Sequence, residues 1–462
     1  MIDLANLQDA DQVRQALIAA GLDADAVGDK PQRFAAAADI LVSDSNQGLA
    51  FFVPGRIEVL GKHTDYCGGH SLVTAVERGF CVVASPRADD RVRVHALDEE
   101  EHVEFRLDPE LDVAHGTWTN YPMTVARRLA RNFDGCRRGV EIAFSSDLPS
   151  ASGMSSSSAL IIATYLVLAA VNELESRPRF RRQITDALTR AEYLGTHENG
   201  QSFGELAGDK GVGTFGGSED HTAILCSRPG HLGLYRYCPT RMKQQIRVPD
   251  DVVFVIGASG VVAEKTGAAQ ELYNRASLRV QALVHAWQAR GAADDDGLSN
   301  APVTYLSQIA DGGDAAITAL RGLITTGSDN FEAEELRVRL EHFLSEEALL
   351  QEAAASLAAG DLAGFGRCVD RSQELTDTLL GNQVPETRDL ARLAREQGAL
   401  AASAFGAGFG GSVWALARRE EAAALCQRWR DSYAACSPAR APLSEFFTTG
   451  AGPAAFEIAM DS

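Results

Sequence analysis

Several features that would assign the chain to a special class of protein are missing from its 462 residues. The eight cysteines are scattered and include no C-x-x-C pair, so we expect no disulfide framework and a reducing, cytoplasmic location. Residues 1–20 lack the basic and apolar regions of a signal peptide, and none is expected. The longest apolar run, at 159–171, is too short to cross a bilayer.

Basic residues are also scarce relative to acidic ones. The chain has 43 Lys and Arg against 63 Asp and Glu, which gives a net charge of −20. A field of this sign repels nucleic-acid phosphates and anionic lipids, so we expect neither nucleic acid nor membrane as a partner. An anionic small molecule would need local Mg²⁺ and backbone N–H groups, which directs attention to glycine-rich loops.

Length and patterning predict an α+β protein with two domains. We expect a helical N-terminal extension over 1–48 and domains over 49–240 and 241–462. Apolar alternation and periodicity predict strands at 49–53, 57–60, 81–84, 92–95 and 139–144, and helices at 124–133, 157–174, 268–292 and within 333–400. The strand candidates 412–417 and 454–459 are expected to pair with a strand at 251–257.

A segment rich in serine joins the strand at 139–144 to the helix at 157–174. It runs from Asp147 to Leu160 and reads D-L-P-S-A-S-G-M-S-S-S-S-A-L. Small residues let the backbone approach an anion closely, and the helix N-terminus favours negative charge. The hydroxyls add donors and a possible Mg²⁺ ligand. No G-K-[ST] follows, so this is not a Walker A loop, and a serine-rich helix cap after a flexible loop would have the same composition.

A second polar segment follows the first predicted strand. Residues 53–69 read V-P-G-R-I-E-V-L-G-K-H-T-D-Y-C-G-G, which sets a cation, an imidazole and a carboxylate close together. Asp accepts hydrogen bonds from vicinal hydroxyls, whereas His and Lys donate them, so the segment suits a polyol ligand. A charged surface hairpin remains the alternative on composition alone.

These segments resemble the signatures of the GHMP kinases. Pro149-x-x-x-Gly153-Met154-Ser155-Ser156-Ser157 is similar to the P-x-x-x-G-L-S-S-S motif of that superfamily, with Ser158 where Ala is usual. Residues 53–69 resemble the motif P-G-R-x-N-x-I-G-E-H-T-D-Y-N-x-G of its galactokinase branch. Residues 213–225 resemble, more loosely, G-x-x-C-G-I-M-D-Q-x-x-x-x-L, and residues 403–412 resemble G-x-G-F-G-G-C.

The resemblance covers the chain from about residue 49 onward. It implies the two-domain GHMP kinase fold, which combines a ribosomal protein S5-like N-terminal domain with an α/β-sandwich C-terminal domain. The active site of that fold lies in the cleft between the domains. The implied activity is ATP- and Mg²⁺-dependent phosphorylation of the anomeric hydroxyl of galactose or a close relative, by a monomer or weak homo-oligomer.

The resemblance also implies roles for individual residues. Asp220 and Arg56 are implied to be the catalytic residues. The sugar contacts are Lys62, His63, Asp65, Gly217 and Tyr273. ATP is bound by Pro149, Ser152, Gly153, Met154, Ser155, Ser156, Ser157 and Ser158, with Trp118 near the adenine. Mg²⁺ is bound by Ser156, within the group from Ser155 to Ser157, and by Glu192.

Two departures in the polyol segment bear on the substrate. Glu58 replaces an Asn of the motif, and Lys62 replaces a Glu that contacts the hydroxyl on carbon six. An ammonium group only donates and is positive, so Lys62 suits a carboxylate there, which makes galacturonate a rival substrate. Alternatively, Lys62 turns to solvent or pairs with an inserted acid. Arabinose, which needs no contact at carbon six, is a further alternative.

Other assignments also have alternatives. Glu192 precedes Asp220 by more positions than the motif allows, which implies an insertion near 197–211 and makes Glu198 and Glu205 alternative metal ligands. Asp220 could merely cap a helix, and Trp118 could be a core residue. A non-catalytic sensor of sugar and ATP is the alternative from another functional class.

Overall fold

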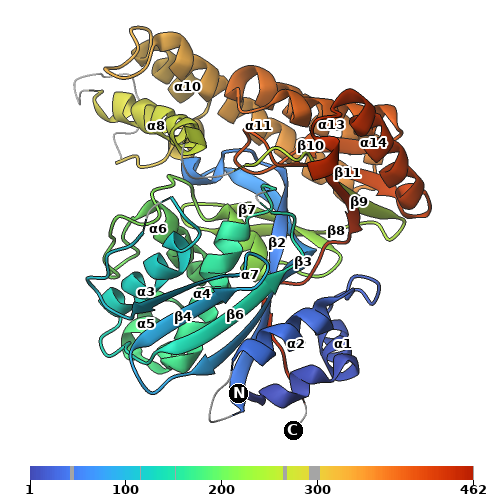
Figure 1. Ribbon diagram of the computed structural model, residues 1–462. Coiled ribbons are helices and arrows are strands. Elements are labelled where there is room, and N and C mark those ends of the chain that lie inside the picture. The colour runs from blue at the N-terminus through green and yellow to red at the C-terminus, as the bar shows by residue number, and fades with distance from the viewer. Residues whose placement is uncertain (42–45, 115, 151, 264–267, 291–301, 461–462) are drawn as a thin grey trace.

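The computed structural model describes residues 1–41, 46–114, 116–150, 152–263, 268–290 and 302–460. Figure 1 shows two lobes, one built around a large sheet and one around a smaller sheet and the helices α8–α14. The strands are β1 (Ile2–Asp3), β2 (Gln47–Leu60), β3 (His70–Pro86), β4 (Arg91–Ala96), β5 (Glu101–Arg106), β6 (Val140–Ser146), β7 (His231–Arg236), β8 (Arg241–Arg247), β9 (Val252–Ala258), β10 (Ala401–Ala404), β11 (Ser412–Arg418), β12 (Glu445–Thr449) and β13 (Phe456–Glu457).

Helices flank both sheets. They are α1 (Ala10–Ala19), α2 (Lys30–Ile40), α3 (Asn120–Asn132), α4 (Ser156–Val171), α5 (Pro178–Gln183), α6 (Ala187–Asn199), α7 (Glu219–Cys226), α8 (Ala268–Gln288), α9 (Leu306–Ala310), α10 (Gly313–Leu323), α11 (Ala333–Ala358), α12 (Leu362–Leu375), α13 (Pro385–Glu396) and α14 (Ala422–Cys436). Short 3₁₀ or π turns lie at Leu4–Gln8, Asp65–Cys67, Leu174–Ser176, Thr376–Leu380, Arg419–Glu421 and Ala441–Leu443. No helix in the described part of the chain is long and apolar enough to cross a membrane.

The larger sheet has the strand order β1-β2-β3-β6-β4-β5, with β13 paired to β2 and the β7–β8 hairpin paired to β3. Its long strands β2 and β3 are apolar on both faces. Phe51 and Val53 point into the core beneath α4, whereas Ala50 and Phe52 point into a second core that includes residues of α1 and α2. Since successive side chains alternate between faces, a sheet covered on both sides produces continuous apolar runs. The N-terminal helices therefore complete the core of this sheet.

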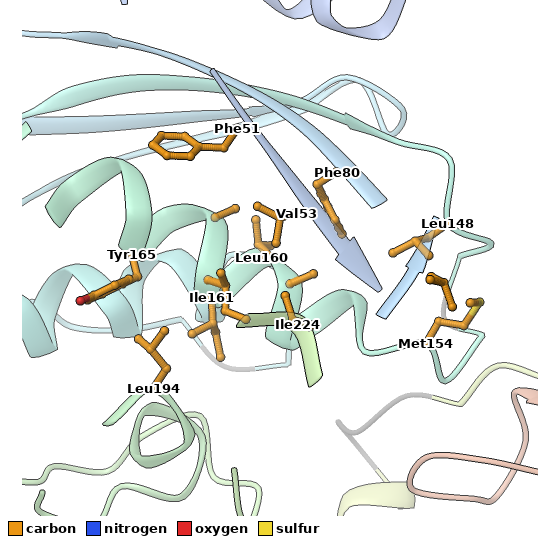
Figure 2. Close-up of a cluster of buried hydrophobic side chains, with 14 of the residues drawn as sticks. Phe51, Val53, Phe80, Leu148, Met154, Leu160, Ile161, Tyr165, Leu194 and Ile224 are labelled. Atoms are coloured by element: carbon orange, nitrogen blue, oxygen red, sulfur yellow. The ribbon is translucent and has the colours of Figure 1, made fainter. Parts of the chain in front are cut away.

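Helix α4 lies against the other face of the sheet. Its sequence is apolar all round, as expected for a helix covered on every side. Figure 2 shows Leu160 and Ile161 of α4 near Phe51 and Val53 of the sheet, with Leu194 of α6 on the far side. This packing fixes the N-terminal end of α4, where the serine-rich loop enters.

The smaller sheet has the order β10-β11-β9-β12 and is antiparallel throughout. Val253 and Val255 of β9 face a core with α13 and α14. Phe254 and Ile256 face the opposite way, toward Leu350 and other residues of α11 and α12. The helical expectation for most of 333–400 is thereby confirmed.

One expectation of strand pairing differs from the structure. Residues 454–459 were expected beside 251–257, but β13 pairs with β2 through Phe456 and Phe52, and β12 takes the place beside β9. The reason is packing: Phe456 lies against Phe52, with ring centroids 5.6 Å apart, in the core shared with α1 and α2. In addition, β8 belongs to the larger sheet, so the chain crosses between the sheets at 248–251, after the expected boundary at 240/241.

Candidate active site

An ion pair between Arg56 of β2 and Asp220 of α7 stands at the centre of a polar cavity. Arg56 Nε lies 2.7 Å and Nη2 lies 2.6 Å from Asp220 Oδ1, and Nη1 donates to the carbonyl of Gly153 at 2.7 Å. The arginine is only 1% exposed. The guanidinium thus connects the predicted catalytic carboxylate to the serine-rich loop.

An irregularity in β2 brings Arg56 to this position. The pairing of β2 with β3 shifts between Pro54 and Arg56, as at a β-bulge that re-aims a side chain. A Cβ on Gly55 would lie 2.8 Å from the carbonyl oxygen of Met154, so only glycine allows the loop to approach so closely. The backbone N–H of Arg56 donates to that same carbonyl at 3.2 Å.

Asp220 does not act as a helix cap. It lies in the first turn of α7, one residue after Glu219, and Ser218 occupies the N-cap position. Its second oxygen, Oδ2, lies 3.2 Å from the hydroxyl of Ser158. The alternative that Asp220 merely caps a helix is therefore wrong.

Glu198, at the end of α6, also reaches this cavity. The hydroxyl of Ser158 donates to Glu198 Oε1 at 2.6 Å, and that of Thr214 donates to Oε2 at 3.3 Å. His221 Nε2 lies 3.8 Å from Glu198 Oε1. This carboxylate therefore stands beside both the start of α4 and the Arg56–Asp220 pair.

Glu192, the expected metal ligand, lies elsewhere. Its carboxylate accepts a hydrogen bond from the backbone N–H of Thr240, beside the β7–β8 hairpin. Six residues along a helix rotate a side chain by about 240°, so Glu192 and Glu198 project from different faces of α6. Among the alternatives predicted from the sequence, Glu198 is the carboxylate at the cavity. Glu205 lies in the loop 200–218, which Asp209 fixes to α3 through a salt bridge to Arg127.

The polyol segment forms a turn at the end of β2 that contacts the cavity. Asp65 Oδ2 accepts a hydrogen bond from the N–H of Glu219 at 3.3 Å. A Cβ on Gly217 would lie 2.5 Å from the same oxygen, so a larger residue there would displace this carboxylate. The ring of His63 lies 5.1 Å from that of Tyr273, between centroids. These four predicted sugar contacts are brought together, and all of them line the cavity.

Lys62 is the exception among the predicted sugar contacts. It is 1% exposed and is not among the residues that line the cavity. Its Nζ donates to the hydroxyl of Ser372 at 3.4 Å, and its backbone N–H donates to Glu346 at 3.2 Å. The expected contact of Lys62 with the sixth carbon of a sugar is therefore not supported, because its side chain points into the smaller-sheet domain toward α12.

The serine-rich loop has the features of an anion site. The hydroxyls of Ser152 and Ser155 are buried and have no hydrogen-bond partner in the described part of the chain. Ser155 has the left-handed φ of 59°, and Gly153 has a φ of 77°. Met154 anchors the loop in the core, as Figure 2 shows. Orphan hydroxyls beside the unsatisfied N–H groups of a helix N-terminus suit phosphate oxygens.

Ser156 and Ser157 form the first turn of α4 and are half-buried. No group of three or more His, Cys, Asp and Glu side chains that could hold a metal occurs among the described residues.

The second glycine-rich loop, at 403–412, lies against the first. Ser412 Oγ donates to the carbonyl of Ser152 at 2.8 Å, and a Cβ on Gly406 would lie 2.8 Å from the carbonyl of Gly153. The loop follows β10 of the smaller sheet and carries Gly406 and Ala407 into the cavity wall. The two domains therefore meet at this site.

None of the predicted ATP residues lines this cavity itself, although Gly153 and Ser158 of the serine-rich loop bond Arg56 and Asp220 in its wall. Two of the predicted ATP residues lie farther away. Pro149 lines a separate hollow between the loop and α14. Trp118 Nε1 donates to Glu101 at 2.6 Å, and its ring packs edge-on against Phe144 at the border of the main core. Phe144 belongs to β6, the strand that precedes the serine-rich loop, so Trp118 packs near the start of that loop.

Sequence reasoning missed two acids at the cavity. Glu58 and Glu219 are buried and line it. Burial raises the pKa of Glu58 to about 7, against the effect of nearby Lys62 and Arg56. Burial, reinforced by the charges of Glu58 and Asp65, raises the pKa of Glu219 well above its ordinary value. Glu58 stands where its motif has Asn, and Glu219 stands where its motif has Met. These two replacements were the only signal in the motifs that could have pointed to these acids.

Comparisons with known proteins agree with this arrangement. The galactokinase galactose-binding signature matches residues 42–86, the GHMP kinase N-terminal domain matches residues 120–199, and the GHMP kinase C-terminal domain matches residues 353–435. A galactokinase of Roseiflexus sp. (strain RS-1) is 27% identical over 373 residues, which cover 79% of this chain and 82% of that protein. A galactokinase of Haemophilus influenzae (strain PittGG) is 25% identical over 390 residues, which cover 83% of this chain and 89% of that protein.

Solved structures show the same fold. The galactokinase of Lactococcus lactis complexed with galactose superimposes with a TM-score of 0.67 at 23% identity, over 89% of this chain and 95% of that one. The mevalonate kinase of Methanococcus jannaschii superimposes with a TM-score of 0.53 at 13% identity, over 88% of this chain and 98% of that one. The two-domain fold that the motifs predicted is thereby confirmed.

Proposed function

Because the chain belongs to the GHMP kinase superfamily, in its galactokinase branch, and is a phosphotransferase, we propose that it phosphorylates the anomeric hydroxyl of galactose or a close relative with ATP. The observation that carries the proposal is the Arg56–Asp220 pair. One guanidinium bonds the carboxylate on one side and the carbonyl of Gly153, in the serine-rich loop, on the other. A proton acceptor and an anion site are thereby held at a fixed separation.

Asp220 is the proposed general base. Arg56 bonds Oδ1 with two nitrogens and Ser158 bonds Oδ2, which hold the carboxylate in place as the acceptor of the proton of the anomeric hydroxyl. Arg56 orients this carboxylate and stabilises negative charge that develops on the transferred oxygens. Since phosphoryl transfer depends mainly on positioning and electrostatics, a small set of rigid groups suffices.

The serine-rich loop and Glu198 are the proposed site of ATP·Mg²⁺. Ser152 and Ser155 contribute buried hydroxyls to phosphate oxygens, together with the N–H groups at the start of α4. Glu198, with a serine of the first turn of α4, would hold the metal in place of Glu192. Bound Mg²⁺ offsets the negative charge of the phosphates. Pro149 and Trp118 remain predicted contributors to the nucleotide site at its margins.

The sugar would lie among His63, Asp65, Gly217 and Tyr273, where an imidazole, a carboxylate and a phenol surround a small cavity. Galacturonate is not favoured, because Lys62 bonds Ser372 and the cavity wall is rich in carboxylates. The retained Arg56–Asp220 pair favours catalysis over a role as a non-catalytic sensor.

An ADP-release assay tests the proposal directly. The protein with ATP, Mg²⁺ and galactose should release ADP only when the sugar is present. Phosphorylation at carbon one should remove the reducing end of the product, which a reducing-sugar assay detects. Absence of sugar-dependent ADP release with galactose, arabinose and N-acetylgalactosamine would contradict the assignment.

A further inference from the structure

One carboxylate of the cavity has no part in the mechanism above. Glu58 is 3% exposed, and its Oε2 accepts a hydrogen bond from the N–H of Gly406 at 3.0 Å. The other oxygen, Oε1, is buried and has no hydrogen-bond partner among the described residues. A buried carboxylate oxygen without a donor is costly, so such an oxygen beside a cavity indicates a ligand that supplies the donor.

The strand geometry directs Glu58 into the sugar end of the cavity. Residues two apart on a strand share a face, so Glu58 points to the side of Arg56, whereas Ile57 and Val59 point into the apolar core. Both Arg56 and Glu58 line the cavity together with His63 and Asp65 of the turn that follows β2. The hydrogen bond from Gly406 engages Oε2, whereas Oε1 is buried in the cavity wall without a partner among the described residues.

Burial raises the pKa of Glu58, and nearby charges act on this pKa in both directions. Arg56 and Lys62 lower its pKa, whereas Glu346 raises it, and Glu219 lies close enough for Glu58 to raise the pKa of Glu219 in turn. Arg56 is committed to Asp220 and Gly153, and Lys62 bonds Ser372. Lys62 therefore does not line the cavity, whereas Glu58 does.

We infer that Glu58 is a sugar-contacting specificity residue, which accepts a hydrogen bond from a hydroxyl of the substrate through Oε1 and rejects sugars that carry a carboxylate. This inference rests on the proposed function, because it concerns the same sugar site. It makes neutral hexoses the ligand class. A carboxylate oxygen placed against Oε1 would supply no donor and would add a like charge in a buried site.

The test compares galactose and galacturonate with the wild-type chain and with Glu58→Gln. The amide keeps the shape of Glu58 and an oxygen for Gly406, but it offers an N–H group and no charge to the cavity. Binding is measured first by titration calorimetry without ATP, and kcat/KM is then measured by ADP release at pH 8. We expect the ratio of galacturonate to galactose, in affinity and in kcat/KM, to rise at least about tenfold in the variant.

If Glu58 only holds Gly406 in place, a different result is expected. The substitution would then weaken the binding of both sugars equally, and the ratio of galacturonate to galactose would not change. That result, or wild-type affinity for galacturonate equal to that for galactose, would overturn the inference. Glu58→Asn, which restores the residue of the motif, serves if the glutamine variant does not fold. Loss of ADP release with every sugar would contradict the proposed function alone, because the calorimetric comparison needs no turnover.

Discussion

Arg56 and Asp220 lie 164 positions apart in the chain, yet two guanidinium nitrogens of Arg56 lie 2.6–2.7 Å from a single carboxylate oxygen of Asp220. The third nitrogen bonds the serine-rich loop at Gly153. A planar guanidinium can make these contacts simultaneously, whereas a lysine ammonium at the same place cannot. The pair therefore sets the distance between the carboxylate and the phosphate site.

Replacing Arg56 by lysine should consequently impair the chemical step more than sugar binding. We expect kcat to fall by about 10²- to 10³-fold, as for the loss of one donor that stabilises developing charge. Steady-state kinetics with galactose varied and ATP saturating measures this. An Arg56→Lys enzyme with kcat close to the wild-type value would show that the contact to Gly153 has no catalytic consequence.

The two glutamates of α6 provide a matched pair for the metal site. Glu198→Gln should raise the Mg²⁺ concentration needed for half-maximal activity by about tenfold or more, because a charged ligand is lost. Glu192→Gln removes the same charge from the face of α6 that contacts Thr240, and should leave the Mg²⁺ dependence unchanged. If an Mg²⁺ titration shows instead that Glu192→Gln raises the requirement and Glu198→Gln does not, Glu192 is the metal ligand.

Gly217 tests the packing of the sugar turn. In Gly217→Ala, a methyl group would lie 2.5 Å from Asp65 Oδ2, and the displaced carboxylate should raise KM for the sugar by about 10- to 100-fold. KM for ATP should change little. Gly322→Ala in α10 is the control: nothing lies within 4 Å of its added Cβ, so it should keep activity and stabilise the fold by about 0.5–1 kcal/mol. Equal KM values for Gly217→Ala and the wild type would show that Asp65 does not contact the sugar.

Much of this site could be predicted from the sequence, because its loops need particular small residues. Gly55 and Gly217 leave no room for a side chain, so such positions carry recognisable motifs. The position of Glu198 could not be predicted with equal certainty, because two glutamates of one helix differ only in rotation. Lys62 was misjudged because the turn after Gly61, with a φ of 103°, redirects the chain toward α11 and α12.

The fold, too, could be predicted only in part from the sequence. The long strand β2 was expected as two short strands, since Pro54 and Gly55 interrupt the apolar pattern, yet both belong to one strand with a register shift. The place of β13 depends on the distant core of α1 and α2, and local patterning carries no information on which sheet a short apolar strand joins. Tertiary contacts decided both cases.

Glu58 should make stability depend on pH. Burial raises its pKa to about 7, so the folded protein binds this proton more tightly than the unfolded chain does. The stabilising contribution is full below the ordinary pKa of 4.5 and is lost as the pH rises through about 7. Glu58→Gln cannot ionise, so its Tm relative to the wild type should increase between about pH 5 and pH 8. A Tm difference that stays constant over this range would contradict the raised pKa.

We propose that Asp220 accepts the proton of the sugar during phosphoryl transfer. Asp220→Asn keeps the size of the side chain and an oxygen for Arg56, but it removes the basic carboxylate. We predict that its kcat for galactose falls by about 10²- to 10⁴-fold, whereas ATP binding measured by calorimetry stays within about threefold of the wild type. Turnover of galactose by Asp220→Asn at a rate close to that of the wild type would contradict the account.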